Sequence, residues 1–224
     1  MDLRGLQDAA ALGHGRKNFY RIINHLEAQG MVKTWRDPFN KKKYAYLTPA
    51  GQAECWDSSN SVAVKQETLL HDLKVSEIAR EFLRRSWAHD VELEHELRDK
   101  ASFRTSFAAI PDAVFVRLDG RKQLRIAFEL ELNRKSTSRL VEKANQYLDR
   151  DSYRYAFYFF TQRHLRDFYY KTMREALGPP VETRLMFFCH EGMMKDGNDL
   201  ATAKGLFKGN EVALGALFEG KDCL

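Results

Sequence analysis

A pair of strand-like runs between Ile110 and Asn133 constrains this 224-residue chain more than any other stretch. The first run reads Ile-Pro-Asp-Ala-Val-Phe-Val-Arg-Leu and the second reads Gln-Leu-Arg-Ile-Ala-Phe-Glu-Leu-Glu-Leu-Asn, with Asp-Gly-Arg-Lys between them. Runs rich in β-branched and aromatic residues on either side of a turn-forming tetrapeptide predict a β-hairpin. Polar and apolar residues alternate in the second run, so Glu129 and Glu131 share one face of the expected strand.

The length of the turn decides which residue lies opposite Glu129. A two-residue Gly-Arg loop, or a four-residue Asp-Gly-Arg-Lys loop, places Asp112 directly opposite Glu129, whereas an Asp-Gly type I′ turn pairs Asp112 with Ala127. In all three registers Asp112, Glu129 and Glu131 share a face, with opposed Cβ atoms about 5 Å apart. A three-residue loop would separate them. Three carboxylates on one face repel one another unless cations or basic groups lie among them, so this pattern predicts a site.

Length and composition favour one large or two modest globular domains, each able to bury its own core. The three cysteines are scattered and lack metal-ligand spacing, which predicts a reducing compartment, namely the cytoplasm. We expect no membrane association, because no apolar stretch has the length of a signal core or of a bilayer span.

The positive charge is concentrated in one small region. The chain carries a net charge of +5, but residues 16–43 hold eight Lys and Arg residues against two acids, a net of +6. The rest of the chain is therefore near neutral in sum. The eight cations are Arg16, Lys17, Arg21, Lys33, Arg36, Lys41, Lys42 and Lys43. This distribution predicts a polyanion-binding surface within the first domain.

The first domain reads as two helices followed by a basic hairpin and a further helix. We expect a short helix over 3–12 and a second over 16–29, whose stripe of Phe19, Ile22, Ile23 and Leu26 faces a core. Gly30 ends that helix in the C′ position. Strands over 31–36 and 43–47 follow. Thr48 then caps a helix that has proline at its first position.

This order resembles a winged helix over residues 1–57. The phrases Leu-Glu-Ala-Gln-Gly-Met-Val at 26–32 and Tyr-Ala-Tyr-Leu-Thr-Pro-Ala-Gly at 44–51 are similar to the recognition-helix exit and the wing exit of bacterial winged-helix domains. The resemblance implies that Lys17, Asn18, Arg21 and Asn24 face the major groove of double-stranded DNA, and that Lys41, Lys42 and Lys43 meet phosphates. The alternative is a structural or protein-binding winged helix with a solvated basic face. Such domains usually have a helix ahead of this pair, whereas little chain precedes Leu3.

A linker over 58–70 and a second domain over 71–224 complete the expected organisation. We expect a long helical region over 69–100 with a break near residues 87–90, and a helix capped by Ser-Thr-Ser at 136–138. A strand covered on both faces follows at 153–160, then a helix over 162–176 and a strand over 184–189. The tail beyond His190 shows only a weak helical pattern. The predicted fold class is α/β (α+β), with a mixed sheet in the second domain.

The second domain resembles the PD-(D/E)xK nuclease-like fold, since Pro-Asp opens one strand and Glu-x-Glu lies near the end of the next. With the winged helix ahead of it, the chain is similar to the replication-relaxation family of plasmid and mobile-element proteins. The resemblance runs through Leu-Leu-His-Asp-Leu at 69–73, Ile-Pro-Asp at 110–112, Phe-Glu-Leu-Glu at 128–131 and the helix carrying Lys143 and Tyr147.

The nuclease pattern implies particular chemistry. Asp112 and Glu129 match the two acids that hold Mg²⁺ or Mn²⁺, for which hard oxygen ligands are suited. The position of the pattern's lysine is Glu131, an acid that could serve only as a further metal ligand. Lys143, or Lys135 at the entrance of the same helix, is the candidate replacement. Alternatively, the glutamates form a solvated strand face paired with Arg117, Arg125 or Lys135.

The sequence therefore predicts a cytoplasmic DNA-binding protein of plasmid or mobile-element type that regulates transcription, replication or mobilisation. Its nuclease-like domain is expected to be non-catalytic, with no certain cofactor. The first alternative is a Mg²⁺-dependent endonuclease or nickase. The second is a transcription regulator whose C-terminal domain senses a ligand or dimerises. Expected partners are double-stranded DNA and a homodimer mate or a relaxation or replication protein.

Overall fold

The computed structural model describes residues 3, 6–7, 16–36, 41–55, 68–94, 96–97, 109–119, 122–193 and 199–220. The chain divides into two compact units, Met1–Glu77 and Ile78–Leu224, and each unit is considered by itself. Residues 58–67 of the expected linker lie outside the described residues. Its last two residues, Leu69 and Leu70, belong to helix α4 (Leu69–Arg84).

Unit 1 contains α2 (Arg16–Ala28), the antiparallel hairpin of β1 (Val32–Arg36) and β2 (Lys43–Leu47), and α3 (Pro49–Cys55). Phe19 and Ile23 of α2 form a small core with Leu3. Ile22 was predicted to face this core but is 43% exposed, which corrects the expected stripe. Successive residues of an α-helix are about 100° apart, so Ile22 lies at the margin of the side on which Ile23 is buried. Of the predicted helix at 3–12, only residues 3, 6 and 7 are described, and all three are helical.

The chain turns tightly on both sides of the β1–β2 hairpin. Gly30 ends α2 with a φ of +71°, a conformation that favours glycine. Thr48 caps α3 as predicted, because its Oγ1 accepts a 3.2 Å hydrogen bond from the N–H of Gly51. A Cβ at Gly51 would lie only 2.0 Å from the carbonyl oxygen of Met31, so the start of α3 approaches the strand entrance too closely for any other residue.

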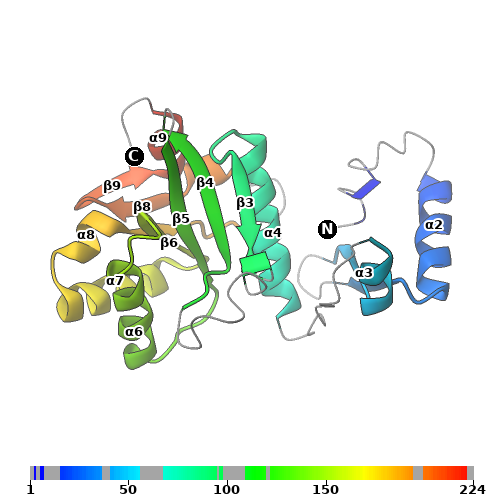
Figure 1. Ribbon diagram of the computed structural model, residues 1–224, viewed down its shortest axis with the longest axis horizontal. Coiled ribbons are helices and arrows are strands. Elements are labelled where there is room, and N and C mark those ends of the chain that lie inside the picture. Colours follow the sequence, from blue (N-terminus) through cyan, green and yellow to red (C-terminus); the bar gives the residue numbers. More distant parts are fainter. Residues whose placement is uncertain are drawn as a thin grey trace. The chain divides into compact units, whose positions relative to one another are not determined.

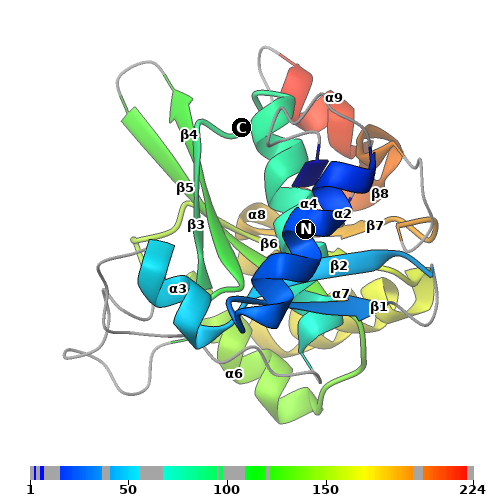
Figure 2. The same ribbon diagram turned by 90° about the vertical axis from the view of Figure 1, so that its right-hand side faces the viewer.

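Unit 2 is built on a seven-stranded mixed sheet in the order β3-β4-β5-β6-β7-β8-β9 (Figure 1). β5, β6 and β7 are parallel to one another, and the remaining neighbours are antiparallel. The strands are β3 (Asp90–Leu93), β4 (Ala113–Asp119), β5 (Lys122–Glu131), β6 (Tyr155–Phe160), β7 (Leu185–Cys189), β8 (Lys204–Phe207) and β9 (Asn210–Ala213). β4 and β5 continue past the end of β3 as a two-stranded hairpin (Figure 2).

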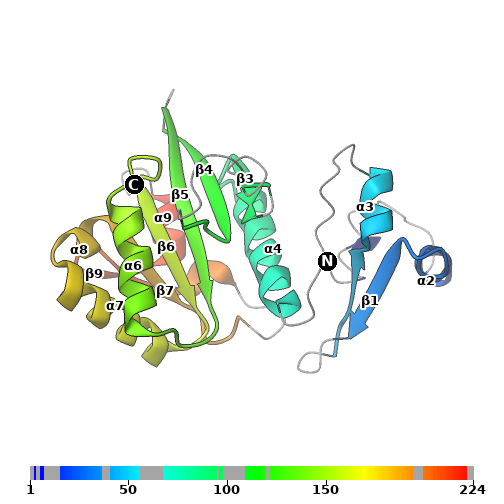
Figure 3. The same cartoon turned by 60° about the horizontal axis from the view of Figure 1, so that its bottom comes forward.

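Helices cover both faces of this sheet. The helices of one face are α6 (Thr137–Leu148), α7 (Arg163–Leu177) and α8 (Pro180–Arg184), and Figure 3 shows α6 and α7 side by side there. On the opposite face, Phe82 of α4 stacks on Phe115 and meets Phe218 of α9 (Leu214–Glu219) edge to face. Every residue of β6 is buried, which agrees with the prediction of a strand covered on both faces.

Two parts of unit 2 differ from the sequence prediction. Residues 90–93 form β3, not the second half of a long helix, because Asp-Val-Glu-Leu alternates with the period of a strand and pairs with β4. The tail, expected to be weakly helical, forms the 3-10 helix η1 (Leu200–Thr202), the β8–β9 hairpin and α9.

The predicted fold class is confirmed, since the chain mixes helices with a large mixed sheet. Among the described helices, none combines the length and apolar character that a bilayer crossing requires.

Candidate functional site

The predicted acids converge on the face of the sheet that α6 and α7 cover. β4 and β5 pair with Asp119 opposite Lys122 and Ala113 opposite Phe128. Extending this register by one residue places Asp112 opposite Glu129, as a two-residue loop requires. The N–H of Asp112 donates to the carbonyl of Phe128 at 3.0 Å, and its Oδ2 accepts from the N–H of Leu130 at 2.7 Å. Asp112, Glu129 and Glu131, with the groups bonded to them, are called the carboxylate cluster below.

Glu129 is completely buried, yet it is held between two donors of α6. Lys143 Nζ lies 2.5 Å from Oε2, and the hydroxyl of Tyr147 donates to Oε1. Lys143 therefore occupies the position that sequence reasoning proposed for a displaced lysine. Burial, followed by the nearby charge of Asp112, raises the pKa of Glu129 to about 7, although Lys143 acts in the opposite direction.

The two donors respond to the same charge. Burial alone would lower the pKa of Lys143, but the charge and hydrogen bond of Glu129 raise it above its usual value. Burial and the charge of Glu129 both raise the pKa of Tyr147 well above that of a free tyrosine. Lys143 is therefore a cation and Tyr147 a neutral donor throughout the ordinary pH range. Their positions on one face of α6 follow from the spacing of four residues.

Glu131 has a matching environment built from different elements. Lys135, which follows β5, donates to Oε1 at 2.7 Å, and Tyr169 of α7 donates to Oε2 at 3.0 Å. The Tyr169 hydroxyl also lies 3.3 Å from the carbonyl of Asn133. Each glutamate is thus bonded to one lysine and one tyrosine. The expectation of a solvated strand face is wrong, because Glu129 and Glu131 are 0% and 1% exposed.

Tyr158 is one of the residues of this region that sequence reasoning missed. It lies beside Glu129 in the parallel β5–β6 register, and its ring packs edge to face against those of Tyr147 and Tyr169. Its hydroxyl is buried and has no hydrogen-bond partner among the described residues. Tyr169 was also missed as a partner of Glu131, because the sequence pattern predicts both tyrosines only as parts of a covered strand and of a helix.

The arrangement does not fit a divalent cation at Asp112 and Glu129. Both oxygens of Glu129 accept hydrogen bonds, and the Lys143 ammonium already supplies at Oε2 the positive charge that a metal ion would bring. Among the described residues, no group of three or more His, Cys, Asp or Glu side chains is arranged to hold a metal ion. The chemistry of the cluster, as folded, is internal charge compensation.

The residues predicted to bind DNA lie in unit 1, mostly exposed. Lys17, Asn18, Arg21 and Asn24 are exposed on α2, opposite its buried side, and are called the basic face of α2 below. Within the described part of unit 1, Lys17 and Arg21 have no carboxylate partner.

The acid of α2 is turned away from the basic face. Glu27 accepts hydrogen bonds from both the N–H and the hydroxyl of Thr34 on β1. The hydroxyl bond is the largest of the effects that lower the pKa of Glu27. Of the predicted wing lysines, Lys41 is exposed, while Lys42 and Lys43 are half-buried. Arg36 of β1 donates to the carbonyl of Lys41 at 2.9 Å.

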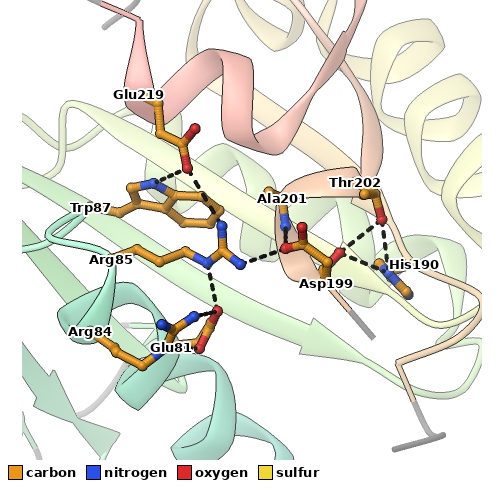
Figure 4. A network of polar contacts seen from close by, with 9 residues as sticks. All are labelled: Glu81, Arg84, Arg85, Trp87, His190, Asp199, Ala201, Thr202 and Glu219. Atoms are coloured by element: carbon orange, nitrogen blue, oxygen red, sulfur yellow. Dashed lines mark hydrogen bonds and ion pairs between the residues drawn. The ribbon is translucent and has the colours of Figure 1, made fainter. Parts of the chain in front are cut away.

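A second polar network lies at the C-terminal end of α4 (Figure 4). Arg85 forms ion pairs with Glu81, Asp199 and Glu219, and its guanidinium lies 5.0 Å from the centre of the Trp87 ring. The indole N–H of Trp87 donates to Glu219 at 3.2 Å. This network joins α4 to the last segment of the chain and contains none of the predicted site residues.

Comparison with models of protein families identifies a relationship that covers most of the chain. A family model described as Replication-relaxation matches residues 3–156, which is more than half of the chain. The matched stretch contains Asp112, Glu129, Glu131 and Lys143 and ends at the second residue of β6. No curated protein and no solved structure matches the chain.

Proposed function

The chain belongs to the replication-relaxation family, and on that basis we propose that it is a DNA-binding protein acting in the replication or mobilisation of a plasmid or other mobile element. Family membership supports the replication-related role of such an element. We propose in addition that unit 1 binds DNA and that unit 2 has a non-catalytic role.

Unit 1 is assigned to duplex DNA as a winged helix. Its support is the order of α2, a basic hairpin and α3, together with the basic face of α2, whose cations have no carboxylate partner within the described part of unit 1. Arg21 and Asn24 are suited to base edges in the major groove, where arginine pairs with guanine and asparagine with adenine. Lys17 and the hairpin lysines are suited to phosphates, which position the protein without reading sequence.

Unit 2 is assigned a supporting role without cleavage. The observation that carries this assignment is the occupied state of Glu129, whose two oxygens are bonded to Lys143 and Tyr147. In a metal-dependent nuclease a metal ion would supply the positive charge that Lys143 supplies here. In the folded chain the Glu129 oxygens stabilise the contact between β5 and α6 instead.

A metal-dependent nuclease remains the second candidate, because a specific observation favours it. Lys143 lies against Glu129, and the charge of Asp112 is close enough to raise the pKa of both groups. These are the residue types of the nuclease pattern, with the lysine supplied by α6. Cleavage would require Lys143 to leave the Glu129 oxygen that it now occupies.

Duplex binding tests the first assignment. The affinity of the full chain for a labelled duplex, measured by fluorescence anisotropy over a range of salt concentrations, is expected to fall steeply with salt. Lys17→Ala/Arg21→Ala should weaken binding, and the slope of log affinity against log salt should decrease by about 0.9 for each phosphate that the variant no longer neutralises. An unchanged affinity and slope would show that the basic face of α2 does not bind DNA.

Incubation with supercoiled plasmid and Mg²⁺ or Mn²⁺ separates the two candidates for unit 2. We expect no nicked or linear product. Cleavage that disappears in Asp112→Ala, with duplex binding retained, would replace the supporting role by the nuclease. The expected homodimer mate or replication partner stays a prediction, which the mass of the protein in solution would begin to test.

A further inference from the structure

A second cationic surface lies in unit 2, although the sequence outside residues 16–43 is near neutral in sum. The segments that leave the carboxyl ends of β5 and β6 are residues 133–139 and 161–166. Together they contain five Lys and Arg residues and no acid. The net charge of unit 2 does not reveal this surface, because acids elsewhere in the unit balance its cations.

The parallel sheet brings these two segments to the same edge. β5 and β6 run in the same direction, so the loops that follow them leave the sheet on one side. Two contacts join the first segment to α7: the guanidinium of Arg134 lies 3.8 Å from the centre of the Phe168 ring, and the hydroxyl of Tyr169 lies 3.3 Å from the carbonyl of Asn133. His164 lies one helical turn before Phe168 on α7 and is exposed.

Some of the cations at this edge are already used within the protein. Lys135 is bonded to Glu131, and Arg166 is paired with Asp167 and also donates to the carbonyl of Lys204. Arg163 lies 3.9 Å from the same aspartate.

Arg134 and Arg139 differ from those three. Both are exposed, and within the described part of unit 2 neither has a carboxylate partner. Arg134, which lies over Phe168, Arg139 in the first turn of α6 and the exposed His164 of α7 are called the cationic edge below.

The contact with Phe168 prepares Arg134 to bind an anion. A guanidinium lying over an aromatic ring keeps its N–H groups free around its rim, where they match the two oxygens of a phosphate. The contact also reduces the side-chain entropy that binding would otherwise cost. No acid lies in the first turn of α6 or α7, so nothing in these turns repels an approaching phosphate.

We infer that the cationic edge is a second DNA-binding surface, which contacts phosphates of the duplex through Arg134 and Arg139. The inference rests on the proposed function, because it takes duplex DNA as the ligand of the chain. It adds that unit 2 contributes to affinity directly and without sequence preference.

Salt-dependent duplex binding by the full chain tests this inference. Arg134→Ala/Arg139→Ala should leave two phosphates without their cations, which reduces the slope of log affinity against log salt by about 1.8 and the affinity by about 60-fold at about 0.1 M salt. The matched control is Lys122→Ala/Lys208→Asn, which removes two exposed cations elsewhere in unit 2. Asparagine suits the φ of +50° at Lys208. The control should bind like the parent chain.

Phe168→Leu tests the stacking separately, because it keeps every charge. Affinity should fall about two- to fivefold with the salt slope unchanged, as expected when one exposed cation–π interaction is removed. Near-equal affinities and slopes for Arg134→Ala/Arg139→Ala and its control would overturn the inference.

Two further outcomes separate this inference from the function on which it rests. If Lys17→Ala/Arg21→Ala weakens binding while Arg134→Ala/Arg139→Ala does not, the proposed function stands and the cationic edge is excluded from it. If polyglutamate binds the chain through Arg134 and Arg139 while duplex affinity is unaffected by their removal, the edge is a surface for an acidic protein and the inference is wrong.

Discussion

The carboxylate cluster of unit 2 and the basic face of α2 in unit 1 hold their charges in opposite ways. Glu129 and Glu131 are buried, and each is bonded to one lysine and one tyrosine. Lys17 and Arg21 are exposed, with no carboxylate partner within the described part of unit 1. Removing a charge from water costs several kcal/mol, so a buried charge has to be compensated inside the protein. An exposed charge stays solvated at little cost.

The difference shows which charges are available to a ligand. Charges of the cluster are consumed by contacts within unit 2, so changing them should alter stability. Charges of the basic face of α2 are not paired within the described part of unit 1, so changing them should alter binding and leave stability almost unchanged. In the sequence both regions are simply candidate sites, because a residue type does not reveal whether its charge is already matched.

Lys143→Met should have the largest effect, because it leaves Glu129 buried without its cation. We expect the free energy of unfolding, measured by urea denaturation at pH 8, to fall by about 3–5 kcal/mol. Lys171→Met on α7 is the control, since Lys171 is 76% exposed and should change stability by less than about 0.5 kcal/mol. Lys143→Met/Glu129→Leu should recover most of the stability. Equal effects for Lys143 and Lys171 would break the contrast between the two regions.

The protonation of Glu129 should make stability depend on pH. Its pKa is raised from 4.5 to about 7 by folding, so the folded chain holds this proton more tightly than the unfolded chain. The stabilisation is complete below about pH 4.5 and is lost as the pH rises through about 7, and it amounts to about 3 kcal/mol.

The measurement is the difference in unfolding free energy between the parent chain and Glu129→Gln, which should decrease by most of that amount from pH 5 to pH 8. Glutamine keeps the size of the side chain but does not titrate, so the change in this difference reports the proton of Glu129. A constant difference would show that Glu129 titrates like a solvent-exposed acid.

Tyr147 and Tyr158 allow a comparison of two buried hydroxyl groups, of which only that of Tyr147 is bonded to the carboxylate cluster. Tyr147→Phe removes a hydrogen bond to a buried carboxylate, and we expect stability to fall by about 1.5–3 kcal/mol at pH 8. Tyr158→Phe removes a buried hydroxyl for which the described part of the chain offers no partner, so stability should be unchanged or rise by up to about 1 kcal/mol. Thermal unfolding of the two variants in parallel is sufficient. A large destabilisation in Tyr158→Phe would mean that its hydroxyl is bonded to an internal water molecule.

Lys17→Ala/Arg21→Ala should have the smallest effect on stability. Both side chains are exposed on α2, and alanine favours the helix, so the free energy of unfolding should change by less than about 0.5 kcal/mol. The same variant should bind duplex DNA more weakly, as expected from the proposed function. Destabilisation by more than about 1 kcal/mol would show that these cations stabilise the fold, as the charges of the carboxylate cluster do.

Much of unit 2 follows from local patterns in the sequence. The alternation in β5 placed Ile126, Phe128 and Leu130 on one buried face and the two glutamates on the other. The register then brought Asp112 opposite Glu129, because a two-residue loop keeps the parity of the strands. These inferences succeed because strand faces and short turns depend on neighbouring residues alone.

The partners of the glutamates could not be read in the same way. Tyr169 lies 38 residues beyond Glu131 and meets it only after β6 and α7 have packed. The core contact between Phe19 and Ile23 was predicted, but the exposure of Ile22 depends on how much apolar surface the rest of the unit supplies.

The β8–β9 hairpin did leave a local signal. Phe207 pairs with Asn210 across Lys208 and Gly209, and both loop residues have positive φ. Two such residues in a two-residue loop define a type I′ turn, for which glycine is a preferred residue. The Lys-Gly pair therefore indicates a two-residue turn, although the four-residue strands on either side of it are weak patterns.

The contacts of Arg85 and Trp87 have a consequence for the order in which the protein can be completed on the ribosome. Their partners Asp199 and Glu219 lie 114 and 132 positions further along the chain. Until Asp199 and Glu219 have been synthesised, the nascent unit 2 lacks the groups that pair with this arginine and with this indole. Unit 1 has no such dependence among its described contacts, so it can fold while translation of the second unit continues.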